Sequence, residues 1–294
     1  MKHSLHSSFY PHIDAHKFTA VVKKLRQFFD NKGLLEVHTQ NRLSILAACE
    51  NPHNIAKFTY NHNIYPLPQT GQMWLEHELL KNPDWPGVFC ISTSYRQEKN
   101  PIAGRHEMIF PMFEFESTGG FNDMLILEMD LLQHLGFNDF YGIDYEEVCE
   151  AYGTSIIENE HEAMLCEHEN VVFLKNFPRR TNPFWNMHSV DGEIYSKCDV
   201  IMYGQETIGS AQRSCDPEKM RENFYTIEDG KYAEKLFELF SRERVEKELE
   251  KFLEHDFFNR FGGGIGMTRL ARAYELLKFE ENVKKTKLDF KFIQ

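Results

Sequence analysis

The sequence predicts an α+β fold in which an antiparallel sheet is flanked by helices. Segments rich in β-branched and aromatic residues cluster at 87–98, 107–117 and 197–204, and they do not alternate regularly with helical segments. Segments with apolar residues at helical spacing precede, separate and follow them. The 294 residues contain no internal repeat and no Gly/Ser-rich linker, so we expect 1–294 to form a single domain.

The first helix is predicted over residues 14–31. Its apolar residues recur at intervals of three and four, which places them on one face. Lys32 and Gly33 should end this helix, and the following segment "LLEVHTQ" (34–40) should be a strand. The residues that carry the helical pattern are Phe18, Val21, Val22, Leu25, Phe28 and Phe29.

The later elements follow from the same patterns. Segments 87–98 and 107–117 should pair as a hairpin around the polar connection "KNPIAGRH". The segment "DMLILEMDLLQHL" (123–135) is predicted to be a helix, and "KCDVIMYG" (197–204) a strand. The charged segment 231–255 should form one long helix.

Composition limits the classes of function. Lys and Arg number 33 against 45 Asp and Glu, a net charge of −12, which argues against a general nucleic-acid binder. No apolar run is long enough to span a membrane and the N-terminus lacks a signal peptide pattern, so we expect a soluble, cytoplasmic protein. The six cysteines form no CxxC pair, which is typical of reduced thiols.

An acidic, His-bearing stretch at 156–170 is the nearest feature to a seam in the chain. It predicts an insertion of about 145–175 on one side of the core. Its His161, Cys166 and His168 could suggest a metal site, but their spacing is irregular. A solvated helix face is the better interpretation, and we assign this stretch no chemistry.

The predicted hairpin supplies the first candidate chemistry. Arg96 and Arg105 flank its tip, and Phe110 lies on the returning strand. Guanidinium groups suit a bidentate grip on phosphate oxygens, and an aromatic ring can stack on a purine. The alternative is a charged hairpin with Phe110 in the core.

A second candidate site lies in "KCDVIMYGQETIGSAQR" (197–213). Asp199 and Glu206 are seven residues apart, and two hard carboxylates near a phosphate site are the usual ligands of Mg²⁺. Taken in isolation, the two acids could equally be solvated surface residues.

Together these motifs resemble the catalytic domain of class II aminoacyl-tRNA synthetases, in the aspartate/asparagine branch. The first family motif resembles "FTAVVKKLRQFFDNKGLLEVHTQ", and the third resembles "GGGIGMTRL". The branch segments "LPQTGQMWLE" and "DVIMYGQETIGSAQR" occur in the expected order, and the resemblance covers nearly the whole chain. The second motif is matched by Tyr95-Arg96-Gln97-Glu98, Arg105-His106 and Phe110.

The resemblance implies an enzyme that binds ATP in a bent form and joins AMP to a carboxylic acid. Arg96 would hold the α-phosphate and the reacting carboxylate, Phe110 would stack under adenine, and Arg269 would lie over its other face or reach the γ-phosphate. Asp199 and Glu206 would bind Mg²⁺. The ATP site would be completed by Glu98, Arg105, His106, Gly264 and Gly266.

On the amino-acid side, the resemblance implies that Glu50 takes the ammonium, with Gln72 and Gly209 beside it. Arg213 would face a carboxylate or amide oxygen. Leu75 stands where aspartyl enzymes usually carry lysine, and Glu76 stands where asparaginyl enzymes have glutamate. This favours asparagine as substrate or product. The alternative is that Glu76 is an ordinary helix-surface residue.

The catalytic resemblance starts within the first twenty residues, so we expect no anticodon-binding barrel. Gly263 replaces an aromatic residue, and the triple glycine resembles asparagine synthetase A, the ammonia-dependent relative. We therefore expect an aspartate–ammonia ligase that forms asparagine, AMP and pyrophosphate, with the α-carboxylate of aspartate on Arg213 and the β-carboxylate on Arg96. The alternatives are a stand-alone asparaginyl-tRNA synthetase, a paralogue with another acceptor, and an inactive regulator that binds ATP or an amino acid.

Some positions depart from the family pattern. Gln40 replaces the proline of the first motif, so the expected homodimer could differ in geometry. Ile109 replaces a glutamate just before Phe110, which bears on adenine recognition. The C-terminal "KKTKLDFKFIQ" also differs from the usual family ending.

Overall fold

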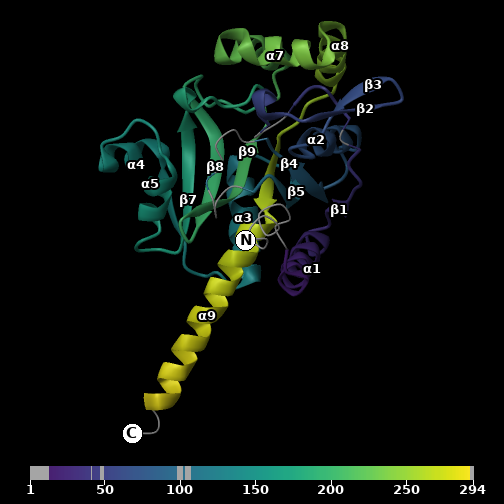
Figure 1. The fold of residues 1–294 in the computed structure, drawn as a ribbon. Coiled ribbons are helices and arrows are strands. Elements are labelled where there is room, and N and C mark those ends of the chain that lie inside the picture. The colour runs from purple at the N-terminus through teal and green to yellow at the C-terminus, as the bar shows by residue number, and fades with distance from the viewer. Residues whose placement is uncertain (1–12, 41, 47–49, 98–101, 103–106, 292–294) are drawn as a thin grey trace, which may run out of the picture.

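The computed structural model describes residues 13–40, 42–46, 50–97, 102 and 107–291, with side chains up to residue 283. Eight strands form one mainly antiparallel sheet in the order β1-β4-β5-β10-β9-β8-β7-β6, and β2 and β3 form a separate hairpin (Figure 1). The strands are β1 (Leu35–Glu36), β2 (Lys57–Tyr60), β3 (Asn63–Pro66), β4 (Gly87–Tyr95), β5 (Ile109–Thr118), β6 (Tyr141–Asp144), β7 (Val171–Pro178), β8 (Ile194–Met202), β9 (Gln205–Gln212) and β10 (Arg260–Gly266). The α-helices are α1 (Ala15–Asn31), α2 (Gln72–Lys81), α3 (Phe121–Leu135), α4 (Tyr145–Tyr152), α5 (Asn159–Leu165), α6 (Pro217–Thr226), α7 (Lys231–Phe240), α8 (Arg242–Leu253) and α9 (Met267–Lys291).

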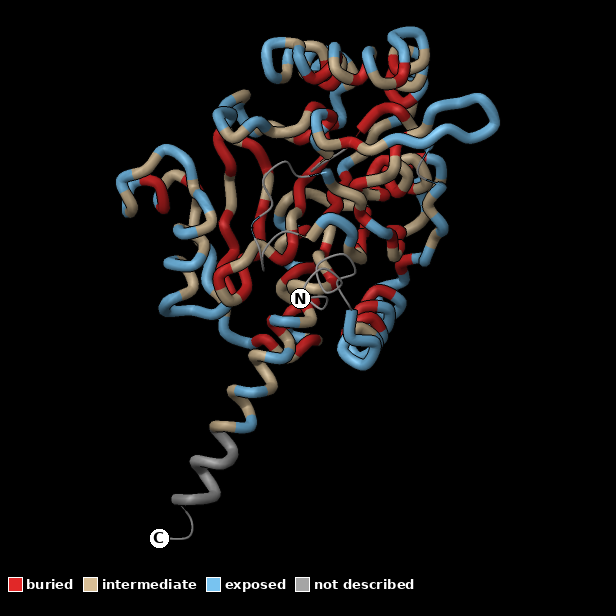
Figure 2. Tube along the Cα trace, in the orientation of Figure 1, coloured by how far each residue is buried: buried red, intermediate tan, exposed pale blue. Residues whose placement is uncertain are grey.

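The predicted α+β class is confirmed, with helices on both faces of the sheet. Helices α1 and α3 and the start of α9 cover one face, where the main apolar core includes Phe29, Phe89, Phe113 and Phe115. Helix α2 packs on the opposite face, over β4 and β5. Figure 2 shows the buried residues concentrated in the sheet and its covering helices, while α9 runs on beyond the body of the domain.

Helix α1 forms where the periodicity predicts it. The Asp14 side chain caps its start by accepting from the backbone N–H of His16 and Lys17 at 2.9 and 3.1 Å. Gly33 follows the helix with φ of +81°, a left-handed conformation that glycine adopts without a steric penalty. The strand predicted over 34–40 is limited to β1, which pairs in parallel with β4.

The predicted hairpin is also confirmed. Strands β4 and β5 pair antiparallel from Gly87 opposite Ser117 to Tyr95 opposite Ile109. Most of its tip, including Glu98, Arg105 and His106, lies outside the described residues.

The predicted acidic insertion lies beside β6 and β7. Helix α4 packs on this edge of the sheet, and the acidic stretch forms the short helix α5, in which no residue is buried. The predicted strand at 197–204 is longer than expected at its N-terminal end, and it turns into β9 through Tyr203 and Gly204, both with positive φ.

The prediction of one long helix at 231–255 is wrong. The segment forms α7 and α8, separated at Ser241, whose φ of +73° and ψ of 143° are not helical. Leu236 and Phe240 of α7, and Val245 and Leu249 of α8, are all buried in one apolar cluster. The break lets both helices bury their apolar faces against the same core.

The described cysteines agree with the expectation of reduced thiols. Cys90, Cys149, Cys166, Cys198 and Cys215 are free in the described part of the chain, and Cys49 lies outside it. Across the described residues, no helix is both long and apolar enough to cross a bilayer.

Glu128 is an unusual member of the core. It lies on α3, is 0% exposed, and its helix neighbours Met124, Leu127 and Leu131 belong to the apolar cluster under the sheet. Burial raises the pKa of Glu128 to about 8, and the nearby Asp199 contributes in the same direction.

We expect Ser241→Gly to stabilise the fold by about 1 kcal/mol, because glycine relieves a backbone conformation that costs a side-chain-bearing residue ~1–3 kcal/mol. Urea unfolding at equilibrium measures the effect. The control is Ser155→Gly, because Ser155 is exposed and is not among the residues with positive φ. This change should instead destabilise the fold by about 0.5 kcal/mol. Equal destabilisation by both changes would contradict the interpretation of Ser241.

We expect Glu128→Gln to stabilise the protein increasingly as the pH rises from about 4.5 to about 8. In this window the unfolded carboxyl is ionised while the buried one keeps its proton, so folding must take up a proton in the wild type only. The gain should reach about 4–5 kcal/mol and level off above pH 8. Parallel pH profiles of wild type and variant would refute it, and the exposed Glu243→Gln is the control.

Candidate active site

Strand register gathers the candidate residues on one face of the sheet, the face covered by α2. Asp199, Gly209, Gly264 and Glu114 are paired in one row across β8, β9, β10 and β5. Because side chains alternate between faces along a strand, positions two residues away share this face. The flanking rows contain Ala211, Gly262 and Glu116 on one side, and Gly266 and Met112 on the other.

Steric crowding explains why glycines occupy these positions of β10. A Cβ on Gly262 would lie 1.8 Å from Glu116 Oε2 and 2.3 Å from Gln72 Nε2, so no side chain fits there. A Cβ on Gly264 would lie 2.8 Å from the Met112 methyl carbon. The strand therefore forms a floor on which side chains from β5 and α2 can lie flat.

Arg96 and Phe110 are brought together, as the sequence predicts. The Arg96 guanidinium carbon lies 5.3 Å from the centre of the Phe110 ring, a cation–π contact. Phe110 is two residues from Met112 and four from Glu114, so it lies on the same face of the sheet. The pair offers a cation beside an aromatic plate, which suits a nucleotide base and its phosphates.

Arg269 and the two carboxylates predicted to bind metal form a second group. Arg269 lies in the first turn of α9, close to Gly266, and its Nη1 donates to the backbone carbonyl of Glu206. A Cβ on Gly209 would lie 3.0 Å from Glu206 Oε1 and 3.5 Å from Asp199 Oδ1. Both carboxylates therefore converge above Gly209.

This carboxylate pair fits a magnesium ion that is shared with a phosphate ligand. Burial raises the pKa of Asp199, the Lys197 ammonium 2.7 Å from its Oδ2 opposes this, and Glu206 adds to it. A divalent cation would offset this mutual repulsion. Mg²⁺ commonly uses one or two carboxylates plus phosphate oxygens, so two acids suffice here.

The acidic stretch 156–170, to which we assigned no chemistry, also contacts the group formed by Arg269, Asp199 and Glu206. The Glu206 backbone N–H donates to Glu162 of α5 at 3.1 Å. Helix α5 therefore holds the backbone of a predicted metal ligand in place.

Glu114 was not predicted, yet it is a hydrogen-bonding centre of the site. It is fully buried and accepts from the Thr70 hydroxyl, the Gly71 backbone N–H at 2.9 Å and the Ser92 hydroxyl at 2.5 Å. Burial raises its pKa, while these donors and the Arg96 charge oppose the increase. Glu114 thus fixes the start of α2 against β5.

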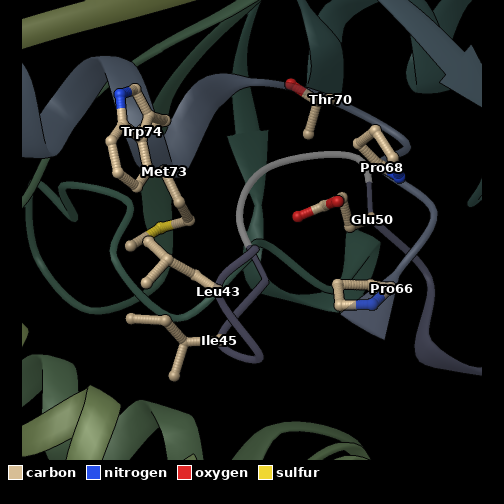
Figure 3. Close-up of a pocket in the computed structure, with 8 residues that line it drawn as sticks. All are labelled: Leu43, Ile45, Glu50, Pro66, Pro68, Thr70, Met73 and Trp74. Atoms are coloured by element: carbon tan, nitrogen blue, oxygen red, sulfur yellow. The ribbon is translucent and has the colours of Figure 1, made fainter. Parts of the chain in front are cut away.

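Glu50 points into a small pocket between the loop after β1 and the start of α2 (Figure 3). Its Oε1 accepts from the Gln69 backbone N–H at 3.3 Å. Pro68 borders this pocket and also a larger hollow of about 460 Å³ along β1 and β4. The small pocket is lined by Leu43, Ile45, Glu50, Pro66, Pro68, Thr70, Met73 and Trp74.

The segment 42–46, which precedes Glu50 in the chain, is held by α7, α8 and Trp185. Glu248 of α8 accepts from the Ser44 backbone N–H and from its hydroxyl at 2.7 Å. The Leu46 carbonyl accepts from Trp185 Nε1 at 2.8 Å and from the Tyr232 hydroxyl at 3.1 Å. These contacts fix the wall of the pocket next to Glu50.

Four charged side chains form a buried charge cluster: Glu76, Glu116, Arg213 and Arg260, each no more than 1% exposed. Arg260 Nη2 lies 2.7 Å from Glu76 Oε2. Arg213 Nη2 lies 3.3 Å from Glu116 Oε2, and its Nε lies 3.6 Å from Glu76 Oε1. Burial raises the pKa of Glu116, the Arg213 charge opposes this, and Glu76 adds to it.

Two amides complete the cluster. Gln72 Nε2 donates to Glu116, and Asn186 Nδ2 donates to both Glu76 oxygens at 2.8 and 3.1 Å. The alternative of Glu76 as a helix-surface residue is wrong, because the side chain is fully buried.

Most of the predicted residues therefore share one face. Glu98, Arg105 and His106 lie outside the described residues, so their prediction stays open. Prediction missed Glu114, Glu116, Asn186 and Arg260. Glutamates at every second position of "FEFE" were an available signal for the first two.

Comparisons with known proteins agree with this fold. A family model described as tRNA synthetases class II (D, K and N) matches residues 14–287. A lysine–tRNA ligase of Porphyromonas gingivalis is 22% identical over 324 aligned positions, covering 92% of this chain and 54% of that ligase.

Solved structures agree as well. Asparaginyl-tRNA synthetase from Pyrococcus horikoshii, complexed with asparaginyl-adenylate, superposes with a TM-score of 0.71 at 19% identity, covering 88% of this chain and 64% of that one. Aspartyl-tRNA synthetase from Entamoeba histolytica gives 0.67 at 18% identity, covering 88% and 54%. The chain thus spans about half to two thirds of the length of these relatives, and the structural likeness concerns the fold. Because the family model matches nearly all of it, the chain belongs to the class II tRNA synthetases of the D, K and N group.

Proposed function

We propose that this chain uses ATP to activate the carboxylate of an amino acid as an acyl-adenylate. The observation that supports this best is the shared face on which Arg96 lies against Phe110 and Arg269 lies against Glu206. Cations, an aromatic plate and two convergent acids are the groups that a folded nucleoside triphosphate requires.

In this proposal the chemistry needs orientation more than acid–base catalysis. Arg96 holds the α-phosphate and the reacting carboxylate together, while Phe110 stacks on adenine. Arg269 neutralises charge on the departing pyrophosphate. A carboxylate oxygen bonds to the α-phosphorus as the bond to pyrophosphate breaks, so charge stabilisation and alignment carry the rate.

Asp199 and Glu206 would hold the Mg²⁺ ion, whose role is to neutralise phosphate charge. The Lys197 ammonium, 2.7 Å from Asp199 Oδ2, offsets part of the negative charge of this pair in the absence of a ligand.

We further propose aspartate as the substrate and ammonia as the acceptor. Glu76, Glu116, Arg213 and Arg260 are two anions and two cations, a set that suits a group with an ammonium and a carboxylate. The α-amino and α-carboxylate groups of aspartate would occupy this cluster. The β-carboxylate would then face Arg96.

Ammonia completes the proposed reaction. Its nitrogen attacks the acyl carbon of the adenylate, AMP leaves with the electron pair of the broken acyl–oxygen bond, and the nitrogen loses a proton to give asparagine. The net charge of −12 supports a small acceptor over a polyanionic tRNA. A homodimer also belongs to this proposal.

A second candidate is activation of asparagine through its α-carboxylate, followed by transfer to tRNA. Asn186 and Glu76 favour it, because an amide side chain presents both an N–H donor and a carbonyl acceptor to such a cluster. Here Glu50 would bind the ammonium.

The test is to incubate the protein with ATP, Mg²⁺ and aspartate, with and without ammonium, and to measure asparagine and AMP. We expect both products to form only when ammonium is present. Asparagine-dependent pyrophosphate exchange without an ammonium-dependent product would favour the second candidate. If neither amino acid supports exchange, the proposed function is wrong.

A matched pair of arginines on α9 tests the nucleotide site. Arg269 and Arg272 both donate to backbone carbonyls of the β8–β9 region, those of Glu206 and Tyr203. We expect Arg269→Gln to lower the rate of pyrophosphate exchange at least ~100-fold, the usual cost of removing a transition-state donor. Arg272→Gln should leave the rate within about threefold. Equal losses would assign Arg269 a purely structural role.

A further inference from the structure

We propose that Arg260 is a specificity-determining residue, which sets the net charge of the buried charge cluster and thereby the charge of the group that it accepts. This inference rests on the proposed function, because it takes the cluster as the place where the amino acid binds. It assigns a role to a residue that the sequence motifs leave without one.

Arg260 is built into the cluster from the first position of β10. It is 0% exposed, its Nη2 is 2.7 Å from Glu76 Oε2, and its Nε is 3.8 Å from Glu116 Oε1. Its Nη1 donates to the Ser214 carbonyl at 3.1 Å, and the guanidinium carbon lies 5.0 Å from the centre of the Phe257 ring. The guanidinium is therefore held between both glutamates by contacts that fix its orientation.

The charge count depends on this residue. With Arg260 the cluster has two cations and two anions and is formally neutral; without it, two glutamates would face Arg213 alone. A buried net charge must be compensated, and a ligand of opposite charge can compensate it. A neutral cluster therefore favours a ligand group without net charge, such as an ammonium and carboxylate together or an amide.

Polar atoms remain for such a group to contact. Asn186 Nδ2 is used by Glu76, and its Oδ1 is buried with no hydrogen-bond partner among the described residues. Within the same described part of the chain, Arg260 Nε also lacks a hydrogen bond. One acceptor and one donor thus match a ligand group that has both kinds of atom.

Two series of compounds test whether the net charge of the cluster sets the charge of the group that it accepts. One series applies to the proposed orientation of the substrate, and the other to the orientation of the second candidate. In the proposed orientation, aspartate presents a neutral group to the cluster, β-alanine a cation and succinate an anion. In the second candidate's orientation, asparagine, 2,4-diaminobutyrate and aspartate present neutral, positive and negative groups. Dissociation constants from calorimetry and KM values from pyrophosphate exchange are measured at pH 8, because burial raises the pKa of Glu116.

We expect Arg260→Gln to raise the affinity for the cationic member relative to the neutral one at least tenfold, since unit charges ~4 Å apart interact strongly at this burial. Glu76→Gln should shift the preference at least tenfold toward the anionic member. Arg260→Lys, which keeps the charge, and the double variant Arg260→Gln/Glu76→Gln, which restores neutrality, should return the ratios to within about threefold of wild type. The double variant also leaves no unpaired charge that could prevent folding.

Surface Arg221, which pairs with Glu218 and Glu250, is the control, and Arg221→Gln should leave every ratio unchanged. If Arg260→Gln weakens all members of a series equally, Arg260 is structural and the inference is wrong. The inference also fails if the wild type binds no member of either series. A different result would support the inference but reject the proposed reaction. In that case Arg260→Gln shifts the relative affinities within the asparagine series, while the wild type makes no asparagine from aspartate and ammonium.

Discussion

The arrangement of the site depends on the pairing of charges that the fold removes from water. Glu76, Glu116, Arg213 and Arg260 come from α2, β5, the end of β9 and the start of β10, so their pairing ties four elements together. An isolated ion at such a position would be strongly destabilising. The four elements can therefore pack closely only when each buried charge is paired, and Gly262 leaves the space in which the four side chains meet.

The need to pair buried charges also distinguishes the two ends of this face of the sheet. At the cluster end the charges pair with one another, which suits selection of a ligand by its own charge. At the other end Arg96 rests on Phe110, and the Asp199 and Glu206 carboxylates converge above Gly209. Lys197 offsets only one of these two negative charges, so a divalent cation can supply the remaining positive charge and bind phosphate oxygens as well.

Periodicity was sufficient for α1 and the β4–β5 hairpin, because their apolar patterns are long and regular. It failed at Ser241, where the pattern continues through a break that depends on one residue's backbone angles. Motifs predicted the residues that we propose to contact the nucleotide, since these lie at fixed spacings. Arg260 and Asn186 could not be predicted in this way, because a buried charge is recognised only by its partners on distant segments.

A ligand that enters this cluster meets groups that already satisfy one another. Replacing one internal hydrogen bond by another gains little, so single contacts discriminate weakly between amino acids. Selectivity must then come from two properties that the internal pairs do not cancel: the net charge of the cluster, and the few polar atoms that make no hydrogen bond. Among the described residues, Asn186 Oδ1 and Arg260 Nε are such atoms, and both belong to residues that contact Glu76. A change at Arg260 therefore alters both sources of selectivity at once, whereas a change in the half that we propose for the nucleotide should alter the rate for every amino acid equally.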